Sequence, residues 1–181
     1  QYIAGTVKVR SNEADCMYSG VMVDTNNFTA KTGVRTFEAA AFLRRCGADV
    51  TRVRKMFRDG AKEYKAKAEA IRNAEIYKNA YAMGICPSEG LDSPTEVGAQ
   101  AANELLDING IKASFVVTEY NGKIYISARS IDEVNVQIVM ERLGGGGHMN
   151  IAGAQLSDST PERAIFVVKD ILNQMLEEGA I

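Results

Sequence analysis

Four consecutive glycines, Gly144 to Gly147, run directly into His148, the only histidine of the chain. Glycine costs a helix about 1 kcal/mol per residue relative to alanine, so the run ends any helix that precedes it, here at Leu143. A backbone without side chains lets a ligand approach closely, and successive N–H groups can form a concave anion site beside the imidazole. The site residues expected on this basis are Gly145, Gly146, Gly147 and His148.

The alternative interpretation of the glycine run is a flexible loop whose histidine only decorates the surface. A lone histidine beside a single glycine would favour that alternative, because such short motifs are weak. Here the run lies between a well-patterned helix and a strand, whereas flexible linkers mix glycine with serine and lie outside compact domains. The pattern therefore favours a binding loop.

A second candidate group lies where the alternating segment KIYISARS meets an expected helix. Arg129 ends the strand, and the capping-box pattern from Ser130 to Glu133 predicts that a helix begins beside it. Ligands of α/β proteins bind where strand carboxyl ends meet helix N-termini, and a guanidinium there suits a phosphate. The alternative is an ion pair of Arg129 with Glu133 or Asp132 at the rim.

Asp24 stands at the end of a helix predicted from the apolar residues 14, 17, 18, 21 and 22, which follow the i, i+3, i+4, i+7, i+8 spacing. A carboxylate at this end of a helix is electrostatically misplaced, because the helix dipole is already negative there. Such a group either faces water or holds a cation. The local pattern alone favours the hydrated alternative.

The first 59 residues are predicted to form helices joined by short loops. Thr36 is expected to cap a helix over FEAAAFLRRC, and Asp49 is expected to cap the next one. The lysine-rich segment 61–77 has helical propensity and only a thin apolar stripe, which fits either a helix bridging two domains or a solvated surface helix. A unit of about 60 residues is near the lower limit for independent stability.

From about residue 79 the pattern changes to strands alternating with helices, which predicts the fold class α/β. NAYAMGIC is expected to be a strand, and Pro94 is expected to open a helix. Two alternating segments joined by Asn121 and Gly122 give the strongest short hairpin signal, because both turn residues need positive φ. Thr160 is expected to cap the last helix. About 100 residues in this part is a usual domain size.

Composition narrows the classes of partner. A net charge of −2 gives no field that draws in duplex nucleic acid, so we expect no such partner. No apolar run is long enough to span a bilayer, so we expect no membrane contact from this segment. Three widely spaced cysteines form no metal-ligand pattern, which indicates a reducing, cytoplasmic compartment. Because the chain begins with Gln1 rather than methionine, we expect it to be a piece of a longer protein.

Two long segments resemble the DHH family of phosphoesterases. VMVDTNNFTAKTGVRTFEAAAFLRRCGADVTRV resembles the second part of a DHH domain, and ISARSIDEVNVQIVMERLGGGGHMNIAGAQL resembles the core of the DHH-associated domain that follows it. The elements TGVRTFEAA, SARS, EVNVQ and GGGGH are most similar to the membrane-anchored cyclic-di-AMP phosphodiesterases of Gram-positive bacteria. The resemblance implies a truncated helical part of a DHH domain over residues 1–59, a linker helix over 60–78, and a small mixed α/β substrate-binding domain over 79–181.

The resemblance also implies a function and its cofactors. Family members hydrolyse phosphodiester or pyrophosphate bonds with two divalent ions, usually manganese, and the parent protein would convert cyclic di-AMP to pApA. Among the family's metal ligands, only the aspartate of a DT pair has a match, which assigns Asp24 to a metal. Arg129, Ser130 and the GGGGH element would grip phosphate and base of a cyclic dinucleotide or short adenine nucleotide. A homodimer and a membrane anchor in the parent are implied as well.

The chain departs from the family pattern because its one histidine does not lie in an Asp-His-His triplet. One carboxylate cannot hold two metal ions about 3.5 to 4 Å apart, so we predict no appreciable hydrolysis by this polypeptide alone. One alternative is a related enzyme acting on short oligoribonucleotides, 3′-phosphoadenosine phosphate or polyphosphate. Another is a non-catalytic nucleotide-binding or dimerisation module, whose binding would be insensitive to manganese and to Asp24→Ala.

Overall fold

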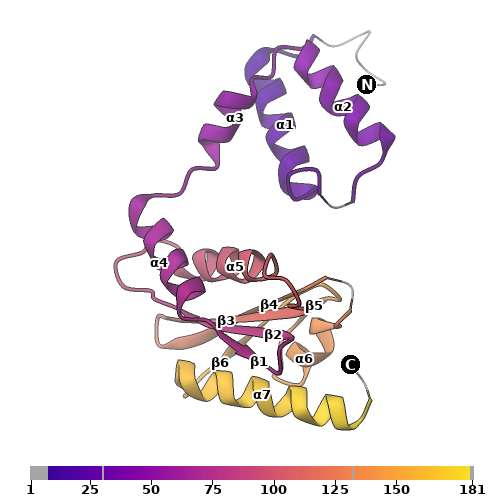
Figure 1. The fold of residues 1–181 in the computed structure, drawn as a ribbon. Coiled ribbons are helices and arrows are strands. Elements are labelled where there is room, and N and C mark those ends of the chain that lie inside the picture. The colour runs from indigo at the N-terminus through magenta and orange to yellow at the C-terminus, as the bar shows by residue number, and fades with distance from the viewer. Residues whose placement is uncertain (1–7, 30, 132, 180–181) are drawn as a thin grey trace. The chain divides into compact units, whose positions relative to one another are not determined.

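The computed structural model describes residues 8–29, 31–131 and 133–179, which divide into two compact units. Residues 1–59 form a helical unit and residues 60–181 form an α/β unit. Within the described residues, no helix combines the length and the apolar character that crossing a membrane requires. The mixed α/β fold class predicted from the sequence is confirmed (Figure 1).

The described residues of the helical unit form three helices around a very small core. They are α1 (Ser11–Asp24), α2 (Val34–Arg45) and α3 (Val50–Met56). Its buried apolar cluster consists of Ala14, Leu43 and Ala48, and Ala40 and Val53 are also buried. Because so little apolar surface is buried, polar contacts must help to hold these helices together.

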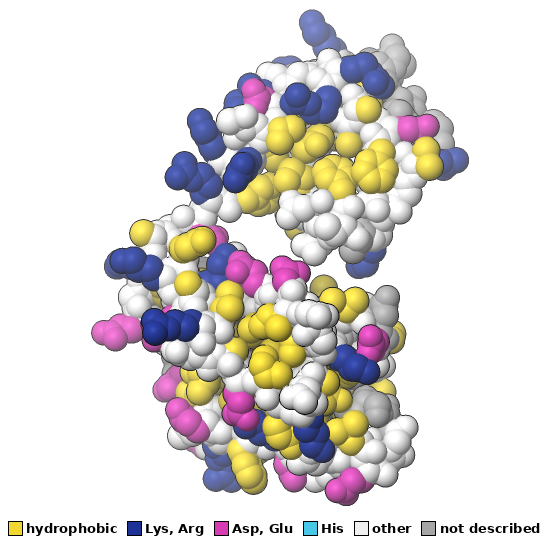
Figure 2. Space-filling model, viewed as in Figure 1, with side chains coloured by type: hydrophobic (Ala, Val, Ile, Leu, Met, Phe, Trp, Pro, Cys, Tyr) yellow, Lys and Arg dark blue, Asp and Glu magenta, His cyan; other side chains and the backbone are white. Residues whose placement is uncertain are grey.

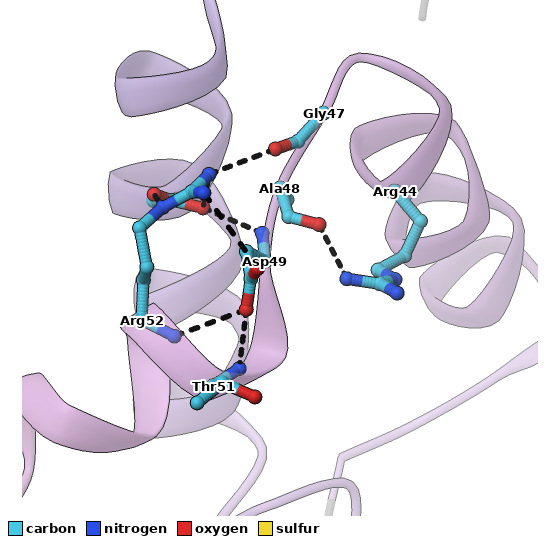
Figure 3. Close-up of polar contacts among 7 residues, drawn as sticks. Arg44, Gly47, Ala48, Asp49, Thr51 and Arg52 are labelled. Atoms are coloured by element: carbon cyan, nitrogen blue, oxygen red, sulfur yellow. Dashed lines mark hydrogen bonds and ion pairs between the residues drawn. The ribbon is translucent and has the colours of Figure 1, made fainter.

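A buried carboxylate, Asp15, fastens α3 to α1 through Asp49 and Arg52, which Figure 3 labels. It accepts a hydrogen bond of 2.7 Å from the backbone N–H of Asp49 and one of 2.6 Å from Nε of Arg52. Arg52 also donates to the carbonyl of Gly47 at 3.0 Å. The hydrogen bond and charge of Arg52 lower the pKa of Asp15. We call this group the Asp15–Arg52 clamp.

The predicted N-cap at Asp49 is confirmed, whereas the one at Thr36 is wrong. The side chain of Asp49 accepts from the backbone N–H groups of Thr51 and Arg52 at the start of α3. Helix α2 already begins two residues before Thr36, after Gly33. The hydroxyl of Thr36 instead accepts from the N–H of Gly33 at 3.3 Å, which satisfies one of the free donors of the first turn.

The α/β unit is a six-stranded sheet with helices on both faces (Figure 1). The strand order is β1-β2-β3-β4-β6-β5, and all neighbouring pairs are antiparallel except β2 and β3. The strands are β1 (Glu75–Tyr77), β2 (Tyr81–Cys86), β3 (Ala113–Tyr120), β4 (Lys123–Ser130), β5 (Gly146–His148) and β6 (Ile151–Leu156). The helices are α4 (Ala61–Arg72), α5 (Pro94–Leu105), α6 (Val136–Glu141) and α7 (Pro161–Glu177).

Two apolar clusters lie on opposite faces of this sheet. Helices α6 and α7 pack on the first face, where Phe115, Ile126 and Val168 belong to the larger cluster. Helices α4 and α5 pack on the second face, mainly over β2 and β3, around Leu105 and Val116. The alternation of buried residues along β4 follows from the two-residue period of a strand.

The hairpin predicted at Asn121 and Gly122 is confirmed. These residues have φ values of 50° and 71° and join β3 to β4, which pair in register from Tyr120 and Lys123 outward. The predicted cap of the last helix is confirmed too, since the hydroxyl of Thr160 accepts from the N–H of Arg163.

The lysine-rich segment is helical only in its first part. Helix α4 ends at Arg72, and residues 75–77, which were expected to continue it, form β1 instead. The short strand pairs antiparallel with β2, so sheet pairing outweighs the helical propensity there. The thin apolar stripe of α4 packs against α5 and β2 through Ala66 and Ala70.

The expected capping box that starts at Ser130 does not form. Strand β4 continues through Ser130, and α6 begins only at Val136, where the side chain of Asn135 accepts from the N–H of Gln137. Asp132 lies outside the described residues.

Candidate functional site

Arg129 and His148 lie in the same row of the sheet. Arg129 on β4 pairs with Ile151 on β6, and Ile151 pairs with His148 on β5. Residues directly opposite one another in neighbouring strands share a face, so all three side chains lie on the face that carries α5. Two strand spacings, about 9 to 10 Å, separate the backbones of Arg129 and His148.

Two further rows complete this open face. Ser127 pairs with Gly153, which pairs with Gly146, and Tyr125 pairs with Gln155. A hollow of about 400 Å³ lies over these rows. We call this face the trough; its residues are Tyr125, Ser127, Arg129, Gly146, His148, Ile151, Gly153 and Gln155.

Helix α5 forms one side of the trough. It packs on β3 and β4, and its residue Thr95 lines the hollow. Near the other end of the helix, Asn103 accepts a hydrogen bond of 2.8 Å from Nε of Arg129. Away from α5, the side chains of His148 and Ile151 are exposed, so the trough is open to solvent above β6 and β5.

The guanidinium of Arg129 is half-buried and has no ion-pair partner within the described residues. Besides Asn103, it donates to the carbonyl of Ala128 at 2.9 Å. Burial lowers the pKa of Arg129, yet a guanidinium remains charged at neutral pH. A partly buried cation without a counter-charge is a favourable contact for an anion, because its desolvation is otherwise uncompensated.

The alternative of a rim ion pair at Arg129 finds no support at Glu133. The carboxylate of Glu133 contacts Lys112 at 2.8 Å instead. The other carboxylate considered, Asp132, lies outside the described residues.

Three glycines of the run are required by the local structure. Gly144 has φ of 76° and ends α6, where its N–H and that of Gly145 donate back to Glu141 and Met140 in a Schellman turn. Gly145 and Gly147 lie against β6: a Cβ would come within 2.2 Å of the Gly153 carbonyl oxygen at Gly145, and within 2.4 Å of the Ile151 carbonyl oxygen at Gly147.

Gly146 differs from its neighbours because a Cβ there would meet nothing within 4 Å. It pairs with Gly153 and faces the trough. The run is therefore not the bare loop expected from the sequence, since residues 146–148 form strand β5. At Gly145 and Gly147 the chain's own strand β6 occupies the space that a side chain would need. At Gly146 that space is open to a ligand.

The structure separates Ser130 from the other expected site residues. Its side chain lies on the opposite face from that of Arg129, because successive strand residues alternate. There it is buried and donates to the carbonyl of Met149 at 3.3 Å. Its observed role is to hold the turn that joins β5 to β6.

Asp24, the expected metal ligand, is the last residue of α1 and is exposed. Its neighbour Thr25 is buried, donates to the carbonyl of Val21 at 2.6 Å and accepts from the N–H of Phe28. Within the described part of the chain, no three histidine, cysteine, aspartate or glutamate side chains gather as they would around a metal ion. A single carboxylate does not fit a two-metal centre.

Sequence reasoning missed several residues of the trough. Tyr125, Ser127 and Arg129 alternate along KIYISARS, so strand periodicity alone could have placed them on one face. Gln155 carries the same signal on the next strand, but its register against Tyr125 depends on pairing across 30 residues of chain. Asn103 gave no signal, because its contact with Arg129 depends on how α5 packs.

Comparison with known proteins identifies similar sequences and similar solved structures. The family model described as the DHHA1 domain matches residues 80–178. The cyclic-di-AMP phosphodiesterase GdpP of Geobacillus thermodenitrificans is 39% identical over 99% of this chain and 27% of its own length. The cyclic-di-AMP phosphodiesterase PdeA of Listeria monocytogenes is 40% identical over 88% of this chain and 24% of its own length. The chain thus spans about a quarter of these relatives.

Among solved structures, an exopolyphosphatase-related protein from Bacteroides fragilis matches with a TM-score of 0.81. The match covers 92% of this chain and 51% of that one, at 23% sequence identity. This likeness supports the fold and carries no information about substrate.

Proposed function

The chain belongs to the DHHA1 domain family, and on that premise we propose that its trough binds the phosphate of a cyclic dinucleotide or short adenine nucleotide. The parent protein would be a phosphodiesterase that converts cyclic di-AMP to pApA, as the names of the relatives suggest. The observation that carries the proposal is the half-buried guanidinium of Arg129, which has no carboxylate partner among the described residues and lies in one row with His148.

The proposed roles follow from the positions of the side chains. Arg129 supplies charge and directional N–H donors to a phosphate, and Asn103 holds the guanidinium in place through Nε. His148, exposed at the end of β5, supplies a further donor or a stacking face. Gly146 leaves the sheet backbone free for close approach. Ile151, between Arg129 and His148, offers an apolar contact to a sugar.

The domain roles are part of the same proposal. Residues 79–181 would bind substrate, residues 1–59 would contribute part of a DHH domain, and residues 60–78 would connect the two. Asp24 would be one ligand of a metal site whose other ligands this chain does not contain. We therefore expect the isolated polypeptide to bind nucleotide and to leave it unhydrolysed in the presence of manganese.

The test is isothermal titration calorimetry of this chain with pApA, with and without manganese. We expect His148→Ala and Arg129→Ala each to weaken binding about tenfold or more, because a hydrogen bond to a charged group contributes about 1.5 to 3 kcal/mol. Asp24→Ala and manganese are expected to leave the affinity unchanged. Wild-type affinity in both trough variants would contradict the proposed site.

A ligand competition distinguishes the related substrates. Cyclic di-AMP, pApA and polyphosphate are compared at equal concentration against one labelled nucleotide. The proposal requires the two adenine compounds to compete better than polyphosphate. Stronger competition by polyphosphate would assign the trough to a polyanion instead.

A further inference from the structure

We propose that the end of the trough formed by Tyr125 and Gln155 is a binding subsite for an adenine base. The proposal rests on the function above, because it takes a phosphate to lie at the Arg129–His148 end. Tyr125 precedes Arg129 by four residues on β4, which corresponds to about 13 Å along the strand. Base and phosphate would thus contact different rows of the same face.

The hollow at this end has suitable size and lining for a planar ring. Its volume of about 400 Å³ falls within the range of about 300 to 1,000 Å³ typical of small-molecule sites. Gly144, Gly145 and Gly153 are among its lining residues, together with Tyr125 and Gln155. A Cβ at Gly144 would meet nothing within 4 Å, so a flat ring can lie directly against the backbone there.

Tyr125 supplies an aromatic surface for stacking. Its ring is half-buried, and it is held between Thr118 on β3 and Gln155 on β6 in one row. Stacking on an aromatic side chain stabilises the binding of any base, because every base has a flat π-face. Tyr125 would therefore add affinity without selecting adenine.

Gln155 would select adenine over guanine. Its amide offers one acceptor and one pair of donors side by side. The N6 and N7 edge of adenine presents the matching donor and acceptor, whereas the corresponding edge of guanine presents two acceptors. Within the described part of the chain, no protein group forms a hydrogen bond with the amide of Gln155, the phenol of Tyr125 or the hydroxyl of Ser127.

A second hollow, of about 360 Å³, is a poorer candidate for a nucleotide. Glu69 and Glu75 line it, together with the apolar Met83 and Ile85. Two carboxylates repel a phosphate, so an anionic ligand is disfavoured there. The Tyr125–Gln155 end of the trough carries no acidic lining residue in the described chain.

The experiment measures three ligands against wild type and variants by calorimetry: AMP, GMP and ribose 5-phosphate, which has the sugar and phosphate but no base. The variants are Tyr125→Ala, Tyr125→Phe, Gln155→Ala and His148→Ala. Gln174→Ala is the matched control, because the amide of Gln174 on α7 bonds to Asp170, away from the trough. Thermal melts of each variant establish that the fold is intact.

We expect wild type to prefer AMP over both GMP and ribose 5-phosphate. Tyr125→Ala should weaken AMP and GMP alike by about 5- to 150-fold, whereas Tyr125→Phe should retain both. Gln155→Ala should weaken AMP by about 5- to 150-fold and remove the preference over GMP. Neither substitution should change the affinity for ribose 5-phosphate, and Gln174→Ala should behave as wild type.

The outcomes separate this proposal from the function it rests on. If Tyr125→Ala and Gln155→Ala keep the wild-type affinity and preference for AMP while His148→Ala weakens all three ligands, the base subsite is overturned and the phosphate site stands. If His148→Ala also binds all three ligands as wild type does, the phosphate site is overturned together with the base subsite.

Discussion

The helical unit and the α/β unit of this chain are stabilised in different ways. The α/β unit contains two apolar clusters on a six-stranded sheet, whereas the buried apolar cluster of the helical unit has three residues and that unit depends on the Asp15–Arg52 clamp. Figure 2 shows apolar side chains gathered on the surface of the helical unit, and the large exposed ones include Met17, Val34 and Phe37. An exposed apolar face of this kind is typical of a unit that packs against another protein surface.

The two units also differ in charge. Residues 1–59 contain ten lysines and arginines and six aspartates and glutamates, for a net charge of +4. Residues 60–181 contain eleven and seventeen, for a net charge of −6. A binding site for phosphate within the negative unit must therefore depend on local groups rather than on the overall field, and Arg129 is such a group.

The largest effect is expected from Asp15→Ala in the helical unit. The substitution removes the acceptor of both the Asp49 N–H and Nε of Arg52, and the three-residue core cannot compensate. In ¹H–¹⁵N correlation spectra, the signals of residues 8–59 should collapse toward random-coil positions, and those of the α/β unit should stay. Dispersed signals from both units would show that the clamp is dispensable.

Protonation of Asp15 at low pH should weaken the Asp15–Arg52 clamp without a mutation. The pKa of Asp15 is lowered in the folded state, so the carboxylate contributes stability above its unfolded pKa of about 3.9. That contribution is lost as the pH falls from about 4 through the lower folded-state pKa. The helical unit should therefore melt earlier than the α/β unit in an acid titration, and Asp49, whose pKa is also lowered, acts in the same direction. Simultaneous melting of both units would contradict this expectation.

The next largest effect is expected from Gly147→Ala in the α/β unit. The new methyl group would overlap β6 backbone atoms, at a residue with φ of 150°, and overpacking of this kind costs about 2 to 3 kcal/mol. Gly146→Ala is the matched control, because it meets open space and should change stability by less than about 0.5 kcal/mol. Urea unfolding curves of the α/β unit measure both. Equal destabilisation by the two would contradict the assigned strand register.

A smaller effect on stability is expected at alkaline pH, and it concerns the α/β unit alone. Burial raises the pKa of the Cys86 thiol to about 11, so the folded α/β unit favours the neutral thiol. In the unfolded chain the thiol ionises near pH 8.5, and stability is therefore lost as the pH rises from about 8.5 toward 11. Melting temperatures across this range should fall for wild type and less steeply for Cys86→Ala. Identical slopes would show that the thiol does not titrate with unfolding.

The smallest effect is expected from Glu133→Gln. Its contact with Lys112 is exposed, and exposed ion pairs contribute about 0 to 1 kcal/mol. Because Glu133 does not neutralise Arg129, nucleotide affinity should remain at the wild-type value. A several-fold gain in affinity would mean that Glu133 competes with the ligand for the guanidinium. Calorimetry at low salt measures this.

The sequence predicted most readily those features that depend on neighbouring residues. The Asn121-Gly122 turn and the caps at Asp49 and Thr160 are local, and the structure confirms them. The pairing of residues 75–77 with β2 overrode a helical propensity, and the delayed start of α6 overrode a capping-box pattern at Ser130. In both cases the sheet, assembled from distant segments, decided the outcome.

The candidate site could be predicted only in part from the sequence, because it too depends on how distant segments pair in the sheet. Arg129 and His148 could be selected from their own surroundings, whereas Asp24 was assigned to a metal only through a family resemblance. That the first two share a row, with Ile151 between them, depends on the order β4-β6-β5. Asp15 gave no sequence signal, because its partners lie 34 and 37 residues away.

Arg129 and His148 are proposed to bind a nucleotide phosphate in the trough of the α/β unit. The most direct measurement is a titration of the ¹⁵N-labelled chain with pApA, followed by ¹H–¹⁵N correlation spectra. We expect the largest chemical-shift changes at the backbone amides of Arg129, Gly146 and His148. Absent changes there, or changes confined to residues 8–59, would contradict that proposal.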